Sequence, residues 1–252
     1  MKSKIIRTVS VIFLLCAAFT AAAPVIITAG RALYGDVGVW TDLILWKPKY
    51  IDSLARSIII SALSALGSVL VSVPAAYVLA KGRIHRRGRL LYIYVFLLLT
   101  PYQIIMLPQY MVVKSLDLYD TIGGLILTFI FYPLTAFLIA QTMKSIPDDI
   151  IDAARLDTSS EMTIAFRIAA PAARPGVICA ALLTFTETWN AVSEPLTLIS
   201  SEDLFPAAVV IGAGEPDRAA FAAASLFILI PLIVYNIFDE EILDGLKNFR
   251  LK

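Results

Sequence analysis

The side chains best suited to chemistry in this chain are two carboxylates and an amide within an apolar stretch. Glu187, Asn190 and Glu194 are spaced by three and by seven residues, which places them on one face of a helix. A charge in the middle of a membrane-spanning helix costs about 2.5–3.5 kcal/mol on insertion scales, so it needs a reason to be there. Two interpretations stay open. The residues form a polar stripe that lines a path and hydrogen-bonds solute hydroxyl groups, or they bond neighbouring helices, with Glu187 protonated.

The chain offers little to a catalytic or metal site. It has one histidine, His85, and two cysteines, Cys16 and Cys179, which lie far apart in apolar surroundings. This spacing provides neither a disulfide framework nor metal ligands, and both thiols are expected to be small buried hydrophobic groups. No Gly-x-x-x-x-Gly-Lys-Ser/Thr loop occurs, so the chain is not expected to cradle nucleotide phosphates. We expect no enzyme activity, bound cofactor or metal in this chain.

The elements that must position the polar residues are predicted to be membrane-spanning helices in a single all-α domain, residues 1–252. The chain is 59% hydrophobic and 16% charged, with a mean hydropathy of +0.80, whereas soluble domains are about 45–50% apolar and about 25% charged. A bilayer core needs about 20 apolar residues per helix, and runs of that length do not fit the alternating strands of a barrel. Six stretches qualify: Thr8–Ala29, Ser57–Ala80, Leu90–Val113, Thr121–Ala140, Pro175–Ile199 and Ala219–Phe238.

The first stretch has an alternative interpretation. Lys2, Lys4 and Arg7 precede the apolar run and Ala21–Ala23 follow it, as in a cleavable signal peptide. Apolarity continues through Pro24 to Ala29, however, so we favour an uncleaved first helix.

The distribution of basic residues predicts the orientation. With the N-terminus inside, 15 Lys and Arg residues fall in cytoplasmic segments and 6 fall outside, and cytoplasmic loops carry the excess of positive charge. Both termini are therefore expected to be cytoplasmic. The run Lys81–Arg89 is interpreted as a topological anchor.

The cytoplasmic segment between the fourth and fifth spans, residues 141–174, is longer than a simple connection requires. Pro147-Asp148-Asp149 is a good helix start, because proline suits the first turn and acids complement the positive helix end. Thr158-Ser159-Ser160-Glu161 resembles a cap before a second helix, and Pro171 interrupts the chain again. Two short helices, apolar on one side, are expected to lie on the cytoplasmic surface and to need a partner for that side.

This segment resembles the EAA loop of permease subunits of ABC importers, in which Glu-Ala-Ala is followed after three residues by Gly and after nine more by Ile-x-Leu-Pro. Asp152-Ala153-Ala154 stands in place of Glu-Ala-Ala, Thr158 in place of Gly, and Ile168-Ala169-Ala170-Pro171 closes the pattern at the same spacing. Asp for Glu is a mild departure. Thr for Gly removes conformational freedom at the bend, although a capping Thr could also end the helix.

Five further stretches are similar to the carbohydrate-uptake, maltose-type branch of that family. In chain order they are Pro101 with Leu107–Tyr110, Leu118–Thr121, Ser145–Pro147, Trp189-Asn190 and Gly245–Lys247. A second glycine usual near the last stretch is missing.

The resemblance implies a permease subunit of a sugar importer in a bacterial or archaeal plasma membrane. Its implied partners are a second permease, expected to be a different chain, two ATPase subunits that use ATP and magnesium, and an external sugar-binding protein. The region Pro147–Ser160 is then the coupling helix on one ATPase. The residues implied in coupling are Asp152, for a polar contact, Ala153 and Ala154, for close approach, and Leu156 and Thr158.

Other interpretations remain. Asp152 could merely cap or solvate its helix, the cargo could be a non-sugar solute, and a proton-coupled secondary transporter could use Glu187 as its proton site.

Three packing features are also predicted. Serines at helical spacing form a small-residue ridge that favours close helix packing, namely Ser57, Ser61, Ser64, Ser68 and Ser72. Kinks are expected at Pro74, Pro101, Pro108 and Pro133. Trp189, Tyr102 and Tyr110 could stack on sugar rings, but packing is the more usual role of such aromatics.

Overall fold

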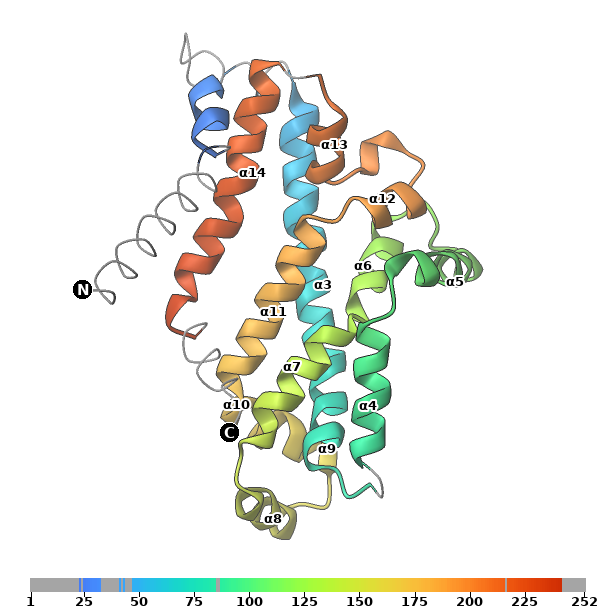
Figure 1. Cartoon of the computed structure of the whole chain (residues 1–252), viewed down its shortest axis with the longest axis vertical. Helices are drawn as coiled ribbons and strands as arrows, with labels where there is room; N and C mark the ends of the chain where they lie inside the picture. The colour runs from blue at the N-terminus through green and yellow to red at the C-terminus, as the bar shows by residue number, and fades with distance from the viewer. Residues whose placement is uncertain are drawn as a thin grey trace, which may run out of the picture.

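The computed structural model describes residues 23, 25–32, 41, 43, 47–84, 87–215 and 217–241. All regular structure in these residues is helical, which confirms the all-α prediction. The long helices follow one axis of the molecule, with α3 at the centre (Figure 1). Most of the first predicted span, with Cys16, lies outside the described residues, as do His85 and the charged residues at both ends of the chain.

Helix α3, Pro48–Lys81, is the central element. Its 34 residues correspond to about 51 Å at 1.5 Å per residue, and Pro48 stands at its start, where a missing N–H is tolerated. The predicted serine ridge is buried along its whole length. Because small side chains let backbones approach closely, this face packs against α7, Pro133–Lys144, and α11, Arg174–Trp189.

A short chain of hydroxyl groups joins these three helices. Ser68 Oγ donates to Thr135 Oγ1 at 2.9 Å, and Thr135 Oγ1 lies 2.7 Å from Thr184 Oγ1. Thr184 in turn donates to the carbonyl of Ala180 at 3.0 Å, within its own helix. These bonds satisfy buried polar groups where no water is expected.

The remaining longer elements are α4, Arg87–Leu98; α5, Tyr102–Ser115; α6, Ile122–Ile130; and α14, Arg218–Ile237. Three of them, α4, α6 and α14, pack on α3, whereas α5 packs on α6 and on α12, Ser193–Leu198. In the described part of the chain, three stretches are long and apolar enough to cross a membrane, namely Pro48–Lys81, Ile122–Lys144 and Arg218–Ile237. There are up to five if each of two bent helix pairs forms one span, Gly88–Leu98 with Tyr102–Ser115 and Glu161–Ala172 with Arg174–Trp189.

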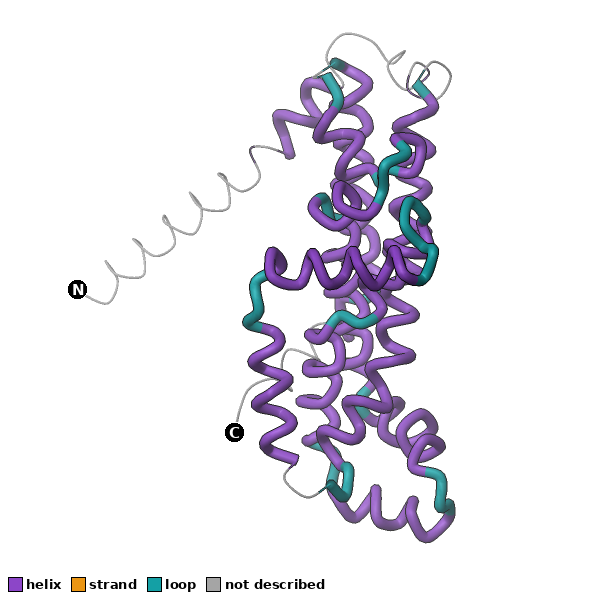
Figure 2. The backbone as a smooth tube through the Cα atoms, turned by 90° about the vertical axis from the view of Figure 1, so that its right-hand side faces the viewer, coloured by secondary structure: helices purple, strands orange, loops and turns teal. Residues whose placement is uncertain are grey.

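The predicted span Leu90–Val113 is divided in two. Helix α4 ends at Leu98, and α5 starts at Tyr102 after a bend of 95°, so that α5 lies across the long axis (Figure 2). Pro101 explains the break, because it has no N–H to donate and disfavours helical geometry at the residue before it. Pro133 likewise stands at the start of α7, whereas Pro74 and Pro108 lie inside continuous helices.

The predicted span Pro175–Ile199 also ends early. Helix α11 stops at Trp189, and a separate short helix follows, α12, Ser193–Leu198. In one continuous helix the ring of Pro195 would clash with the carbonyl of Ala191. Proline is tolerated in the first turn of α12, so the chain starts a new helix there. Two more short elements, η2, Glu202–Leu204, and α13, Ala207–Ala213, lead to α14.

The loop predicted to hold two short helices does so. The first is α8, Asp148–Asp157, with both acids in its first turn. The second is a helical run of three parts, α9, Glu161–Ile164, the π-helical turn η1, Ala165–Ala169, and α10, Ala170–Ala172. Its predicted cap is present, since Ser160 Oγ accepts the N–H of Thr163 at 3.2 Å.

The contact between α11 and α7 depends on Gly176. A Cβ atom at this position would lie 2.0 Å from Thr142 Oγ1 and 2.5 Å from Thr142 Cβ. Gly176→Ala is therefore expected to destabilise the protein by about 1–3 kcal/mol, as overpacking of a filled interior does. The measurement is thermal unfolding of the purified chain in detergent.

Gly212→Ala is the matched control, because a Cβ at that helical position meets nothing within 4 Å. Both variants gain the same helix propensity. Equal melting temperatures for the two variants would show that α7 and α11 are not held this closely.

Candidate functional site

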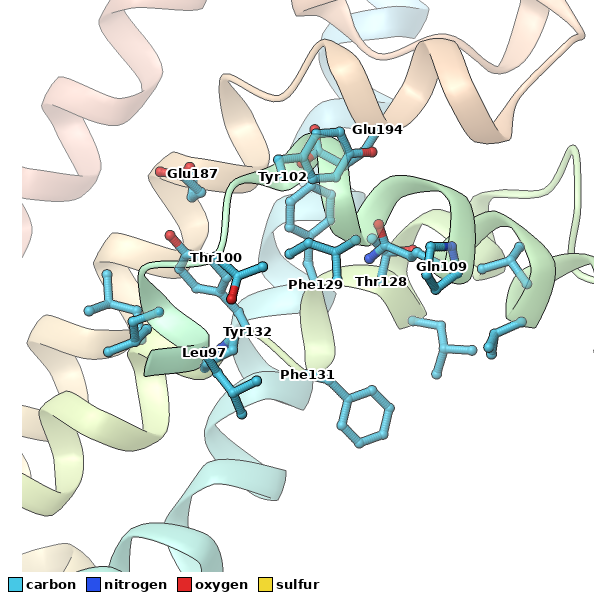
Figure 3. Close-up of a pocket in the computed structure, with 18 of the residues that line it drawn as sticks. Leu97, Thr100, Tyr102, Gln109, Thr128, Phe129, Phe131, Tyr132, Glu187 and Glu194 are labelled. Atoms are coloured by element: carbon cyan, nitrogen blue, oxygen red, sulfur yellow. The ribbon is translucent and has the colours of Figure 1, made fainter. Parts of the chain in front are cut away.

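A cavity of about 890 Å³ lies at the bend between α4 and α5. Its walls come from α4, α5, α6, α7, α11 and α12, and its polar lining consists of Thr100, Tyr102, Gln109, Thr128, Tyr132, Glu187 and Glu194 (Figure 3). The rest of the lining is apolar or aromatic and includes Phe129 and Phe131. A mostly apolar hollow with a few polar groups is the usual make-up of a ligand site.

The structure brings together two of the three polar residues singled out in the sequence. Glu187 on α11 and Glu194 on α12 both line the pocket. Asn190 does not, since its side chain turns back to donate to the carbonyl of Thr186 at 2.8 Å. The expected single stripe is thus split, because α11 ends at Trp189. A role for these residues in a transport path stays a prediction.

The aromatic residues considered in the sequence have different surroundings. Trp189 is buried, stacks between Phe185 and Phe227, and donates its Nε1–H to the carbonyl of Phe227 at 3.2 Å. Its role here is packing. Tyr102 lines the pocket, next to Glu194 in Figure 3.

Sequence reasoning did not find Thr100, Tyr132 and Phe131 as pocket residues. Each lies within two residues of Pro101 or Pro133, where a helix is interrupted. Interrupted helices leave backbone and side chains facing a cavity, so the two prolines were the available signal.

Asp120 fixes the chain that follows α12. Its carboxylate accepts the N–H groups of Ser200 and Ser201 at 2.8 and 2.9 Å and the Ser201 hydroxyl at 2.6 Å, and its own N–H donates to Leu198. The Ser201 hydroxyl, with the two backbone N–H groups, holds the pKa of Asp120 below its ordinary value. The next residue, Thr121, caps α6 by accepting the N–H of Gly124 at 3.1 Å.

Helix α8 presents two distinct faces. Ile151 and Ala154 are buried in the largest apolar cluster of the described residues, whereas Asp152, Ala153 and Leu156 face outward. Ala154 therefore differs from the expectation that it meets a partner, because its methyl group packs on this chain's own core. Leu156 is 89% exposed.

The replacement of glycine by Thr158 carries no conformational cost. Thr158 follows α8 with φ −148° and ψ 141°, which is extended backbone that any residue adopts. Its Oγ1 also accepts the N–H of Ser160 at 3.2 Å, which helps to end one helix and start the next. The side chain that caps the next helix is that of Ser160, and not that of Thr158.

Asp152 has partners within the chain and remains largely exposed. Its Oδ1 accepts from Arg155 at 3.1 Å and from Arg83 at 3.4 Å, while 59% of its side-chain surface stays accessible. Among the described residues, no group of three or more His, Cys, Asp or Glu side chains could hold a metal ion.

The sequence is similar to those of known membrane transport proteins. The family described as "Binding-protein-dependent transport system inner membrane component" matches residues 68–243. The chain is 31% identical over 212 residues to a trehalose transport system permease protein of Mycobacterium tuberculosis, covering 80% of this chain and 77% of that protein. It is 28% identical over 207 residues to an arabinooligosaccharides transport system permease protein of Halalkalibacterium halodurans, covering 81% and 73%.

A solved structure shares the fold. It is a bacterial ABC transporter involved in the import of the acidic polysaccharide alginate, and one of its chains superposes with a TM-score of 0.79 at 20% identity, covering 96% of this chain and 98% of that chain.

The Asp120 contacts predict a local effect on the segment after α12. Asp120→Ala removes three accepted hydrogen bonds, so the amides of Ser200 and Ser201 should exchange with deuterium about tenfold faster or more, because local opening of this segment then needs no carboxylate contact to break. Hydrogen exchange with mass spectrometry measures this. Asp117→Ala is the control, because Asp117 also has a positive φ, 55° against 60°. Equal exchange in both variants would contradict the role of the carboxylate.

Proposed function

Because this chain belongs to the family of binding-protein-dependent transport system inner membrane components, we propose that it is a permease subunit of an ATP-driven importer for a sugar or oligosaccharide. It forms half of the translocation path, and the partner permease, a different chain, forms the other half. Two ATPase subunits bind ATP and magnesium, and an external binding protein delivers the sugar. The chain is a multi-pass component of the plasma membrane.

The pocket supports a sugar as the cargo. It presents hydroxyl and amide groups from Thr100, Tyr102 and Gln109, together with the carboxylates Glu187 and Glu194. These groups hydrogen-bond neutral polyhydroxy solutes, and aromatic faces pack on sugar rings. The sugar relatives described above favour the same class of cargo.

The orientation follows from the basic residues. With six spans and both termini in the cytoplasm, α8 lies on the cytoplasmic side and α12 near the outer side. These elements are far apart along the axis of the molecule (Figure 1), as an energy-coupling site and an outer entrance require.

The observation that carries the coupling role is the exposure of Leu156. Leu156 is 89% exposed, on the side of α8 opposite the buried Ile151 and Ala154. It gives α8 an apolar outer face next to the charged Asp152. Burying a leucine contributes about 1.5–3 kcal/mol, so this face suits a protein partner. We assign Asp152, Ala153 and Leu156 to the ATPase contact. Ala154 packs on the core of this chain, and Thr158 stands at the end of α8, so neither is assigned to that contact.

Purification in mild detergent followed by mass spectrometry tests this function. A second permease and an ATPase are expected with the tagged chain. Leu156→Asp should reduce the recovered ATPase about tenfold or more, because it replaces about 1.5–3 kcal/mol of apolar burial by a buried charge, while the second permease is retained.

Leu196→Asp is the matched control. Leu196 is 57% exposed on α12, distant from α8 in Figure 1, so the ATPase should remain. A chain that purifies without an ATPase and moves solute on a proton gradient alone would contradict the importer function.

A further inference from the structure

Two cations join α8 to the inner end of α3. The first is Lys81, the last residue of α3, which is buried. Its Nζ donates to the carbonyl of Ile146 and to Asp148 Oδ1, both at 2.6 Å. Lys81 therefore holds the start of α8, since Asp148 is the first residue of that helix.

The second cation, Arg155, reaches in the opposite direction. From the last turn of α8 its Nη2 donates to the carbonyl of Lys81 at 3.1 Å and lies 3.4 Å from the hydroxyl of Tyr77. Only 12% of its side-chain surface is exposed. Arg155 thus attaches the end of α8 to the last turn of α3. Lys81, in the same turn, attaches the start of α8.

Arg155 also connects α9 to this junction. Its Nε and Nη2 donate to the two carboxylate oxygens of Glu161 at 3.0 and 3.3 Å. Glu161 Oε2 accepts the hydroxyl of Tyr77 at 2.5 Å, and Tyr77 is buried within α3. Arg155, Glu161 and Tyr77 therefore form a closed triangle that joins three helices.

Glu161 remains charged under physiological conditions. Its hydrogen bonds from Arg155 and then from Tyr77 hold its pKa below the ordinary value. Its stabilising contribution is complete above about pH 4.5, the ordinary pKa of this side chain, and is lost only as the pH falls through the lowered pKa. At neutral pH the junction is an ion pair with bidentate geometry, which is stronger than an isolated surface pair.

The two loops that flank α8 are less suited than α3 to transmit a displacement of α8. Ser145–Pro147 leads into the helix and Thr158–Ser160 leads out, and both are short, non-helical and mostly exposed. Helix α3, in contrast, runs the length of the molecule. Toward its other end Ser57 Oγ accepts the N–H of Ala207 at 2.8 Å, and Arg56 donates to Phe205 at 3.3 Å.

We propose that Arg155 is a positioning residue that, together with Lys81, makes α8 and α3 move as one body. A displacement of α8 then reaches the outer end of the molecule through α3, and not through the loops that flank α8. The transmission step rests on the proposed function. The attachment of α8 to α3 does not, because it is a property of this chain alone.

Distances between spin labels test the attachment. In a chain with Cys16 and Cys179 replaced by alanine, one pair of labels at Val78→Cys and Asp157→Cys measures α3 against α8. Both sites are exposed. A narrow distance distribution is expected, identical in the resting complex and with Mg-ATP plus vanadate.

Arg155→Met should broaden that distribution. Detached arrangements of α8 should rise about tenfold in population, which corresponds to about 1.4 kcal/mol. Arg155→Lys keeps the charge but loses the fork geometry, and should restore only part of the attachment. Arg167→Met, at an exposed arginine of η1, is the matched control and should leave the distribution unchanged. An unchanged distribution in Arg155→Met would overturn the proposal.

A second pair of labels tests the transmission. Ile59→Cys on α3 and Leu229→Cys on α14 are both exposed in the structure. Mg-ATP plus vanadate should change their distance in the wild-type background. In Arg155→Met that change should be lost, while the ATPase still copurifies and still hydrolyses ATP, which a simple folding defect would not produce.

The outcomes separate the two claims. If the distance between the labels at Ile59 and Leu229 still changes fully with Mg-ATP plus vanadate in Arg155→Met, transmission through this residue is overturned. If no ATPase copurifies with the wild-type chain, the proposed function fails, and the comparison of the first label pair in the isolated chain still decides whether Arg155 attaches α8.

Discussion

The close packing of α3 against α7 and α11 is the constraint on which the rest of the structure depends. Lipid tails are as apolar as leucine, so apolar burial alone does not hold membrane helices together. Here the buried serines of α3 let the neighbouring backbones approach, and hydroxyl bonds between Ser68 and Thr135 and between Thr135 and Thr184 fix the register. With these helices in place, the pocket is built beside α7 and α11, and α8 docks at the C-terminal end of α3.

The pocket follows from interruptions in that helical frame. Pro101 turns α5 across the bundle, and the end of α11 at Trp189 moves Glu194 onto α12. Both changes open the space that Glu187 and Glu194 share. Asp120 then holds the segment after α12 through its three accepted hydrogen bonds. In a permease, polar groups and broken helices belong where water or solute replaces lipid.

Much of this fold could be predicted from local chemistry. The serine ridge, the helix start at Asp148 and the cap at Ser160 depend on residues close in the chain, and the structure confirms all three. The 95° bend could not be predicted, because Pro101 marks a break without setting its angle. The inward turn of Ala154 and the triangle around Arg155 could not be predicted either, because both depend on contacts with residues far away in the sequence. The pairing of Asp120 with Ser200 and Ser201 spans 80 residues or more and leaves no local signal.

The most direct measurement of the central claim is the water accessibility of the pocket in different nucleotide states. A cysteine-free importer with the single replacement Glu187→Cys is reconstituted in vesicles, and the rate of reaction with a membrane-impermeant thiol reagent added outside is compared at rest and with Mg-ATP plus vanadate. If ATP binding beneath α8 controls access to a shared path, the two rates differ. Equal rates, with ATP hydrolysis intact, would contradict the coupling of α8 to the pocket.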